Sequence, residues 1–322
     1  MGICFCPAVS LHSDSKEGTT SVLPCKRHMH ATHALRKGLF MAQFTNQAQL
    51  SYNNSTVSSN TVIGQLQEVL SLSKTPINRS YRPGDTITYA INLINSGTSA
   101  LTNLRLTDDL GAYTIGSATY VPLTYTEDSV RYFVNGVLQA TPTATAGNTL
   151  SFSGINIPAG GNAAILYDAE VNGFADPTAA GSITNAVTAE GTGITALTAS
   201  GVVPASAEPL LSITKSLSPV PVVENGLLTY TFTIENIGSA AATADGNVTV
   251  TDTFQPILSG ISVTLDGTVL TRNTDYTYNE TTGEFATIPG KITIPSATFA
   301  QGTDGVWTVS PGSVVLTVSG TV

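Results

Sequence analysis

The sequence from residue 42 to residue 322 contains no cysteine, no histidine and no methionine. A region without these residues has no thiol nucleophile, no imidazole base and no sulfur or imidazole metal ligand. It also has no glycine-rich phosphate loop that opens a helix. We therefore expect no enzyme, no cofactor and no metal, and at most a reaction that the chain performs on itself.

Positive charge is also scarce, since 13 Lys and Arg stand against 22 Asp and Glu, a net charge of -9. An acidic chain has no basic face for a nucleic acid. No apolar run approaches the length of a membrane span. The abundant residues are small, hydroxyl-bearing or β-branched and fall in short alternating runs, which is typical of all-β extracellular modules.

All cysteines, histidines and methionines of the chain lie in residues 1–41. We interpret this segment as unstructured and as translated from a mis-assigned start upstream of Met41, because Arg36-Lys37-Gly38 resembles an encoded ribosome-binding site. An acylated or disulfide-forming tail and a metal site are the alternatives, although the acylation pattern fits poorly and no spacing matches a zinc finger. No secretory signal peptide follows either start.

An internal repeat dominates the rest of the chain, because residues 70–110 return at residues 211–254. The matching pairs are Leu70 and Leu211, Lys74 and Lys215, Tyr89 and Tyr230, Asn95 and Asn236, Gly97 and Gly238, and Asp108 and Asp252. Between these matching residues the sequence alternates in short strand-like runs, which end at turn dipeptides such as Asn135-Gly136. This pattern predicts two tandem immunoglobulin-like β-sandwiches.

The repeat divides the chain into segments of unequal completeness. We predict an unstructured segment 1–41, an N-terminal strand segment 42–69, a complete sandwich 70–209 (repeat 1) and an incomplete sandwich 210–322 (repeat 2). Repeat 1 closes with strands that begin "ITNAVT", and repeat 2 has no counterpart of them. Residues 42–69 begin with the similar "FTNQAQ", so this segment is a candidate donor of the strands that repeat 2 lacks.

Strand alternation places Lys74, Asp108 and Asn185 on the core-facing side of repeat 1. A buried unpaired ammonium is costly, so it must be paired or chemically consumed. Burial favours the neutral, nucleophilic amine, and a protonated acid polarises a carboxamide. We predict an isopeptide bond between Lys74 and Asn185, promoted by Asp108. The unlinked alternatives are an ion pair capped by the amide, and a Lys74 that reaches solvent.

Repeat 2 carries the same lysine and acid without the asparagine. Lys215 and Asp252 face inward by the same alternation, and so does Asn46 in the N-terminal strand segment. Asn46 of another copy is therefore the candidate cross-link partner of Lys215, with Asp252 as the promoting acid.

The runs "SLSKTP", "YRPGDTITYAINLINSGTSALTNLRLTDDL" and "ITNAVT", with "SITKSLSP" and "VTVTDTF" in the second copy, resemble a bacterial conserved repeat family, domain of unknown function 11. The resemblance implies tandem immunoglobulin-like modules in structural surface or envelope proteins. This sequence departs from most members because it shows no signal peptide or anchor, and because repeat 2 lacks the closing strand.

Together these observations predict a structural subunit of a bacterial surface or spore-associated fibre, assembled head to tail by β-strand donation and locked by Lys-Asn bonds. Its partners would be other copies of itself or related surface proteins, with no nucleic acid and no membrane span. It would lie on the extracellular or spore surface. The alternative is a cell-surface adhesin or ligand-binding module that acts as a monomer.

Overall fold

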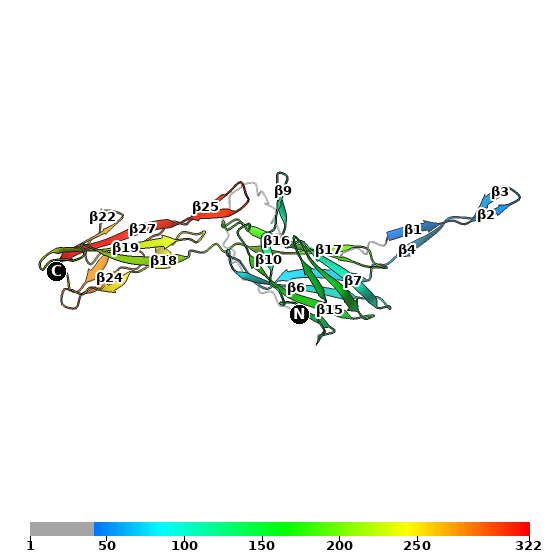
Figure 1. Cartoon of the computed structure of the whole chain (residues 1–322), viewed down its shortest axis with the longest axis horizontal. Helices are drawn as coiled ribbons and strands as arrows, with labels where there is room; N and C mark the ends of the chain where they lie inside the picture. Colours follow the sequence, from blue (N-terminus) through cyan, green and yellow to red (C-terminus); the bar gives the residue numbers. More distant parts are fainter. Residues whose placement is uncertain (1–41) are drawn as a thin grey trace, which may run out of the picture.

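A computed structural model of the chain describes residues 42–322. Its regular structure is almost entirely β, with two tandem immunoglobulin-like sandwiches that follow an extended N-terminal hairpin (Figure 1). The prediction of an all-β chain with an incomplete second sandwich is confirmed. Within these residues, no helix is long and apolar enough to cross a membrane. The interpretation of residues 1–41 concerns a segment outside the described part.

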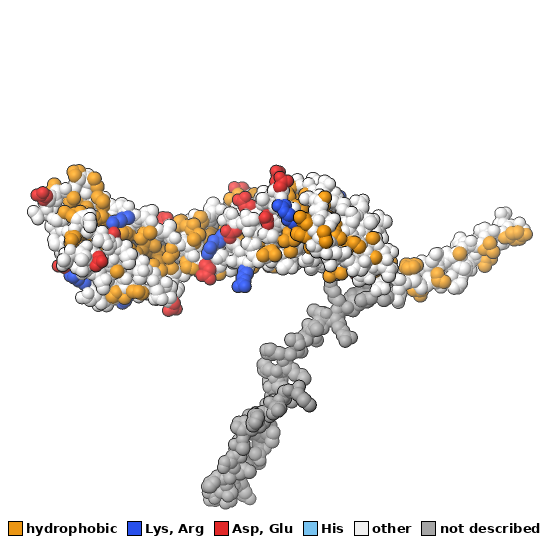
Figure 2. Space-filling view, turned by 90° about the horizontal axis from the view of Figure 1, so that it is seen from below, with side chains coloured by type: hydrophobic (Ala, Val, Ile, Leu, Met, Phe, Trp, Pro, Cys, Tyr) orange, Lys and Arg blue, Asp and Glu red, His pale blue; other side chains and the backbone are white. Residues whose placement is uncertain are grey.

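The N-terminal hairpin projects from repeat 1 at the end away from repeat 2 (Figure 1). It pairs β1 (Ala42–Asn46) with β4 (Val62–Leu66) and β2 (Gln49–Tyr52) with β3 (Ser55–Ser58). Asn53 and Asn54 at its tip have φ of 44° and 62°, as a tight hairpin turn requires. Figure 2 shows apolar side chains along its length.

The expectation that Phe44 and Asn46 point into a core is not met within one chain. Both side chains are exposed, as is every other side chain described from Phe44 to Ile63. The physical reason is that the hairpin is two-stranded along its whole length, and no second layer from residues 42–322 packs against it. The strands were predicted correctly, but among the described residues the Phe44 ring lies only over Gly64 of the paired strand and no core forms beneath it.

Repeat 1 consists of two antiparallel sheets. The first has the order β12 (Val137–Leu138), β11 (Arg131–Val134), β15 (Asn162–Val171), β6 (Thr86–Asn95), β5 (Leu70–Pro76), and β10 (Leu123–Tyr125) pairs with β15. The second has the order β13 (Thr143–Ala146), β14 (Leu150–Ile157), β7 (Leu101–Asp108), β16 (Ser182–Glu190), β17 (Leu197–Pro204). The short hairpin of β8 (Tyr113–Ile115) and β9 (Ala118–Tyr120) stands apart from both.

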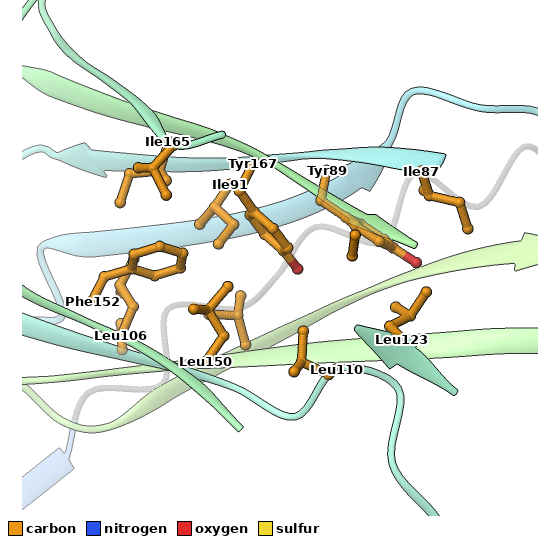
Figure 3. Close-up of a cluster of buried hydrophobic side chains, with 14 of the residues drawn as sticks. Ile87, Tyr89, Ile91, Leu106, Leu110, Leu123, Leu150, Phe152, Ile165 and Tyr167 are labelled. Atoms are coloured by element: carbon orange, nitrogen blue, oxygen red, sulfur yellow. The ribbon is translucent and has the colours of Figure 1, made fainter. Parts of the chain in front are cut away.

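The core of repeat 1 lies between these sheets, because successive strand residues point to opposite faces. Tyr89 on β6 and Tyr167 on β15 point from one sheet toward Leu106 and Leu150 on the other (Figure 3). The two tyrosine rings stack with their centroids 5.6 Å apart. These strands therefore aim two phenol groups into a mainly apolar interior.

Repeat 2 preserves the first sheet and loses half of the second. The first has the order β18 (Leu211–Ser218), β19 (Leu227–Asn236), β27 (Gly312–Thr321), β21 (Ser259–Leu265), β22 (Thr268–Val269). The second has the order β20 (Thr251–Thr253), β24 (Glu284–Thr287), β23 (Tyr276–Tyr278). In repeat 1, β7 pairs with both β14 and β16. Its equivalent β20 pairs, among the described strands, only with β24, so this sheet ends at an open edge.

A hairpin of β25 (Thr298–Gln301) and β26 (Trp307–Ser310) joins repeat 2 to repeat 1. The backbone N–H of Trp307 donates to the carbonyl of Gly173 at 2.9 Å. The amide of Gln301 donates to the hydroxyl of Tyr113 at 3.0 Å. The Tyr120 ring lies over Gly305, where an added Cβ would come within 2.2 Å of it. The two repeats are therefore docked together by direct contacts.

Candidate functional site

Repeat 1 gathers Lys74, Asp108 and Asn185 in one buried cluster. They come from β5, β7 and β16, so strands far apart in sequence and from both sheets contribute. Lys74 is 4% exposed, and Asp108 and Asn185 are fully buried. The sequence predicts a cross-link among these three residues.

The carboxylate of Asp108 is the centre of the hydrogen bonds. Lys74 Nζ donates to its Oδ2 at 2.5 Å, and the Tyr167 hydroxyl donates to the same oxygen at 2.6 Å. The Leu110 backbone N–H donates to Oδ1 at 3.0 Å. Both oxygens of this buried acid are thus engaged, as burial of a carboxyl group requires.

The carboxamide of Asn185 contacts the cluster through Tyr167. Its Nδ2 donates to the Tyr167 hydroxyl at 2.9 Å, and its Oδ1 accepts from the Gly111 backbone N–H at 3.2 Å. Gly111 shares this N–H with Asp109 Oδ1, 2.9 Å away. Asp109 also accepts from the Ala186 backbone N–H at 2.8 Å, which fixes β16 beside the end of β7.

Burial changes the protonation of the cluster. It lowers the pKa of Lys74 from 10.5 to about 8, against the opposing effect of the nearby Asp108 carboxyl group. Burial raises the pKa of Asp108, and the Lys74 charge only partly opposes this. Both shifts favour the uncharged forms, an amine beside a carboxylic acid. Such an amine has the lone pair that a nucleophile needs.

Tyr167 is a member of the cluster that the sequence did not predict. It is fully buried and bridges Asp108 and Asn185. Its position on β15 alternates with Ile165 and Ala169, so the sequence marks it as core-facing. A tyrosine in an apolar strand is expected to be an ordinary core residue. Its polar contacts become evident only when the fold places Asp108 and Asn185 beside its hydroxyl.

Repeat 2 holds the same ion pair in an open setting. Lys215 Nζ contacts Asp252 Oδ2, but the two side chains are 40% and 18% exposed. The Thr253 backbone N–H donates to Asp252 Oδ1 at 2.8 Å. The expectation of an inward, core-facing pair is thus only half met, because no strand equivalent to β17 covers β18 in the described part of the chain. Strand β1, which ends at Asn46, lies on the far side of repeat 1 from β18, which contains Lys215 (Figure 1).

The uncovered side of β18 and the free edge of β20 together form a surface that we call the acceptor face. All residues of β18 are exposed, including the apolar Leu211, Ile213 and Leu217. The equivalent strand β5 buries Leu70 and Lys74 under β17. The two strands have related sequences, so the difference comes from the missing cover and not from the strands themselves.

Comparison with known proteins extends only to the fold. No protein-family model matches the chain, and no curated protein matches its sequence. The resemblance to the conserved repeat family therefore stays a prediction.

Similar solved structures include the pilus backbone RrgB of Streptococcus pneumoniae, with 14% identity over 75% of this chain and a TM-score of 0.31. The match spans 55% of that pilus protein. Another is BcpA, the major pilin subunit of Bacillus cereus, with 11% identity over 84% of this chain and 73% of that chain and a TM-score of 0.31. At these values the likeness carries no functional argument.

Proposed function

We propose that this chain is a structural subunit of a bacterial surface fibre, in which the N-terminal hairpin of one copy completes repeat 2 of the next. One observation carries the proposal. The N-terminal hairpin exposes an apolar face, and among the described residues repeat 2 lacks the two strands that close repeat 1. The same hairpin motif is already seated in repeat 1 as β16 and β17.

The donor side of the pair is the exposed apolar face of the hairpin. Phe44 is 57% exposed, whereas Ile183, which precedes "TN" in the same way on β16, is 2% exposed. Leu50 and Val57, which pair across the hairpin, are exposed as well. Burial of such side chains stabilises an association by roughly 1.5–3 kcal/mol each, before the cost of ordering the partners.

The acceptor side is the face that β16 and β17 cover in repeat 1. There, β16 extends the sheet from β7, and β17 packs across β5. In repeat 2 the corresponding positions beside β20 and over β18 are open, with Ile213 53% exposed. A donated hairpin would pair with β20 and cover β18 at the same time.

The placement of the two surfaces favours a polymer. The hairpin and the acceptor face lie toward opposite ends of an elongated molecule (Figure 1). A contact between different surfaces of successive copies is heterologous, and a heterologous contact that does not close on itself generates an open filament.

A covalent lock fits the same geometry. If "FTN" occupies the place of "ITN", Asn46 stands beside Lys215 as Asn185 stands beside Lys74. The reaction joins Lys215 Nζ to Asn46 Cγ, breaks the Cγ–Nδ2 bond and releases ammonia. A second bond of the same kind, between Lys74 and Asn185, forms within each copy.

Electron microscopy and gels of the full chain test the proposal. We expect filaments that give a ladder in boiling SDS. Asn46→Ala should keep the filaments and lose the ladder, whereas the matched control Asn60→Ala, on the same hairpin, should keep both. Phe44→Asp should leave monomers.

Monomers of the unaltered chain at high concentration would contradict strand donation and favour the monomeric adhesin. Filaments that dissolve in SDS would contradict only the intermolecular bond.

A further inference from the structure

We infer that Tyr167 is a catalytic residue of the repeat 1 cluster, whose hydroxyl passes a proton from Asp108 to the nitrogen that leaves Asn185. This inference rests on the proposed bond between Lys74 and Asn185. It assigns a chemical task to a hydroxyl that contacts both the acid and the asparagine.

The connectivity of the cluster supports the assignment. The promoting acid must act on the asparagine, yet within residues 42–322 no direct hydrogen bond joins Asp108 to Asn185. Tyr167 is the link, because its hydroxyl lies 2.6 Å from Asp108 Oδ2 and 2.9 Å from Asn185 Nδ2.

The orientation of the carboxamide is fixed by its other contact. The Gly111 backbone N–H can only donate, so the Asn185 atom 3.2 Å from it is the oxygen. Nδ2, the atom that must depart as ammonia, therefore faces the Tyr167 hydroxyl. In the resting cluster Nδ2 donates to this hydroxyl, and once Cγ is attacked the nitrogen gains a lone pair that can take the Tyr167 proton.

The site excludes a solvent route for this proton. Tyr167 is fully buried, and its ring packs against Tyr89 at 5.6 Å and Phe152 at 5.8 Å between centroids (Figure 3). Burial raises its pKa well above the ordinary value, so the hydroxyl keeps its proton and works as a relay, not as a phenolate.

The reaction then balances. Neutral Lys74 Nζ attacks Asn185 Cγ, and the carbonyl electron pair moves to Oδ1. The Cγ–Nδ2 bond breaks, and Nδ2 takes the Tyr167 proton while Tyr167 takes the proton of Asp108. Asp108 recovers a proton from Nζ, and the carbonyl re-forms. The products are one secondary amide and one ammonia, with Asp108 and Tyr167 unchanged.

Repeat 2 supplies an internal comparison. Tyr167 pairs with Tyr89 across β15 and β6, and the corresponding partner of Tyr230 across β27 and β19 is Val318. The Lys215 centre thus has no tyrosine at the position of Tyr167, and the Tyr167 hydroxyl serves only the Lys74 bond. Loss of the Tyr167 hydroxyl should slow only the Lys74 bond.

The test measures the intact mass of the full chain at intervals after cell-free synthesis, with peptide mapping of each linkage. We expect the unaltered chain to lose one ammonia at Lys74–Asn185. Tyr167→Phe should form this bond at least about 100-fold more slowly, the lower range for general acid catalysis. Tyr125→Phe is the matched control, since its ring packs on Tyr167 at 6.4 Å, and it should react at the unaltered rate.

A Tyr167→Phe chain that links at the unaltered rate would overturn the relay and leave the bond intact. An unaltered chain without the Lys74–Asn185 linkage would overturn both. If Tyr167→Phe does not fold, a fluorotyrosine incorporated at position 167 keeps the ring and acidifies the hydroxyl. A relay then predicts a changed rate, whereas an unchanged rate would overturn it.

Discussion

Lys74–Asp108 and Lys215–Asp252 are the same pair of residue types in two environments. The first pair has no exposed side-chain surface, and the second is open to solvent. Removal of one partner from a buried pair leaves an uncompensated group, at a cost of roughly 3–5 kcal/mol. An exposed pair contributes about 0–1 kcal/mol.

We therefore expect Asp108→Ala to destabilise repeat 1 by about 3 kcal/mol in an Asn185→Ala background, where the bond cannot form. Asp252→Ala is the control, and it should change the stability of repeat 2 by less than about 1 kcal/mol. Urea denaturation that follows each repeat separately measures both effects. Equal losses in the two repeats would contradict the role of burial.

At the scale of elements, the sandwich of repeat 1 closes where β17 meets β5. Gly201 on β17 lies tightly against β5, since an added Cβ would lie 2.7 Å from the Pro76 side chain and 3.1 Å from the Lys74 carbonyl oxygen. A backbone this close leaves no room for a side chain.

Gly201→Ala should push β17 away from β5 and destabilise repeat 1 by roughly 1–3 kcal/mol, as overpacking does. The control is Gly147→Ala in the same repeat, where the nearest heavy atom to an added Cβ is 4.0 Å away. Thermal unfolding of the two variants gives the comparison. A Gly201→Ala chain as stable as Gly147→Ala would show that the strands can separate at no cost.

The strand alternation in the sequence correctly predicted that Lys74, Asp108 and Asn185 point into the core of repeat 1. It was not enough for Tyr167, because a tyrosine within an apolar strand looks the same whether its hydroxyl bridges two polar groups or lies unpaired. For Asn46 it predicted only which residues share a face, since alternation does not tell whether another layer covers that face.

The sequence likewise did not predict the junction between the repeats, because its contacts join the β25–β26 hairpin to Gly173 and to the β8–β9 hairpin of the other repeat. Trp307, the only tryptophan of the chain, lies there. It borders a cavity of about 460 Å³ that Tyr81 and Phe299 also line. The fluorescence of Trp307 therefore reports on the contact between the two repeats.

Tyr120→Ala should loosen this junction, because it removes the ring that covers Gly305 and packs against Tyr113 and Phe174. We expect a red shift of the Trp307 emission and a broader range of dimensions in small-angle X-ray scattering, with each repeat still folded. Tyr52→Ala, at the exposed end of the hairpin, is the control and should change neither. An unchanged emission spectrum in Tyr120→Ala would contradict the assigned contact.

The positions of β5 and β17 determine how a fibre of this protein would respond to mechanical tension. Tension enters repeat 1 at the start of β5 and leaves it at the end of β17. With the proposed bond in place, it passes from Lys74 directly into β16 through Asn185. The chain between these two residues then carries no force and cannot unravel. With both proposed bonds in place, only residues 46–74 and 185–215 of each copy would carry the load, and the rest of each sandwich would stay folded under tension.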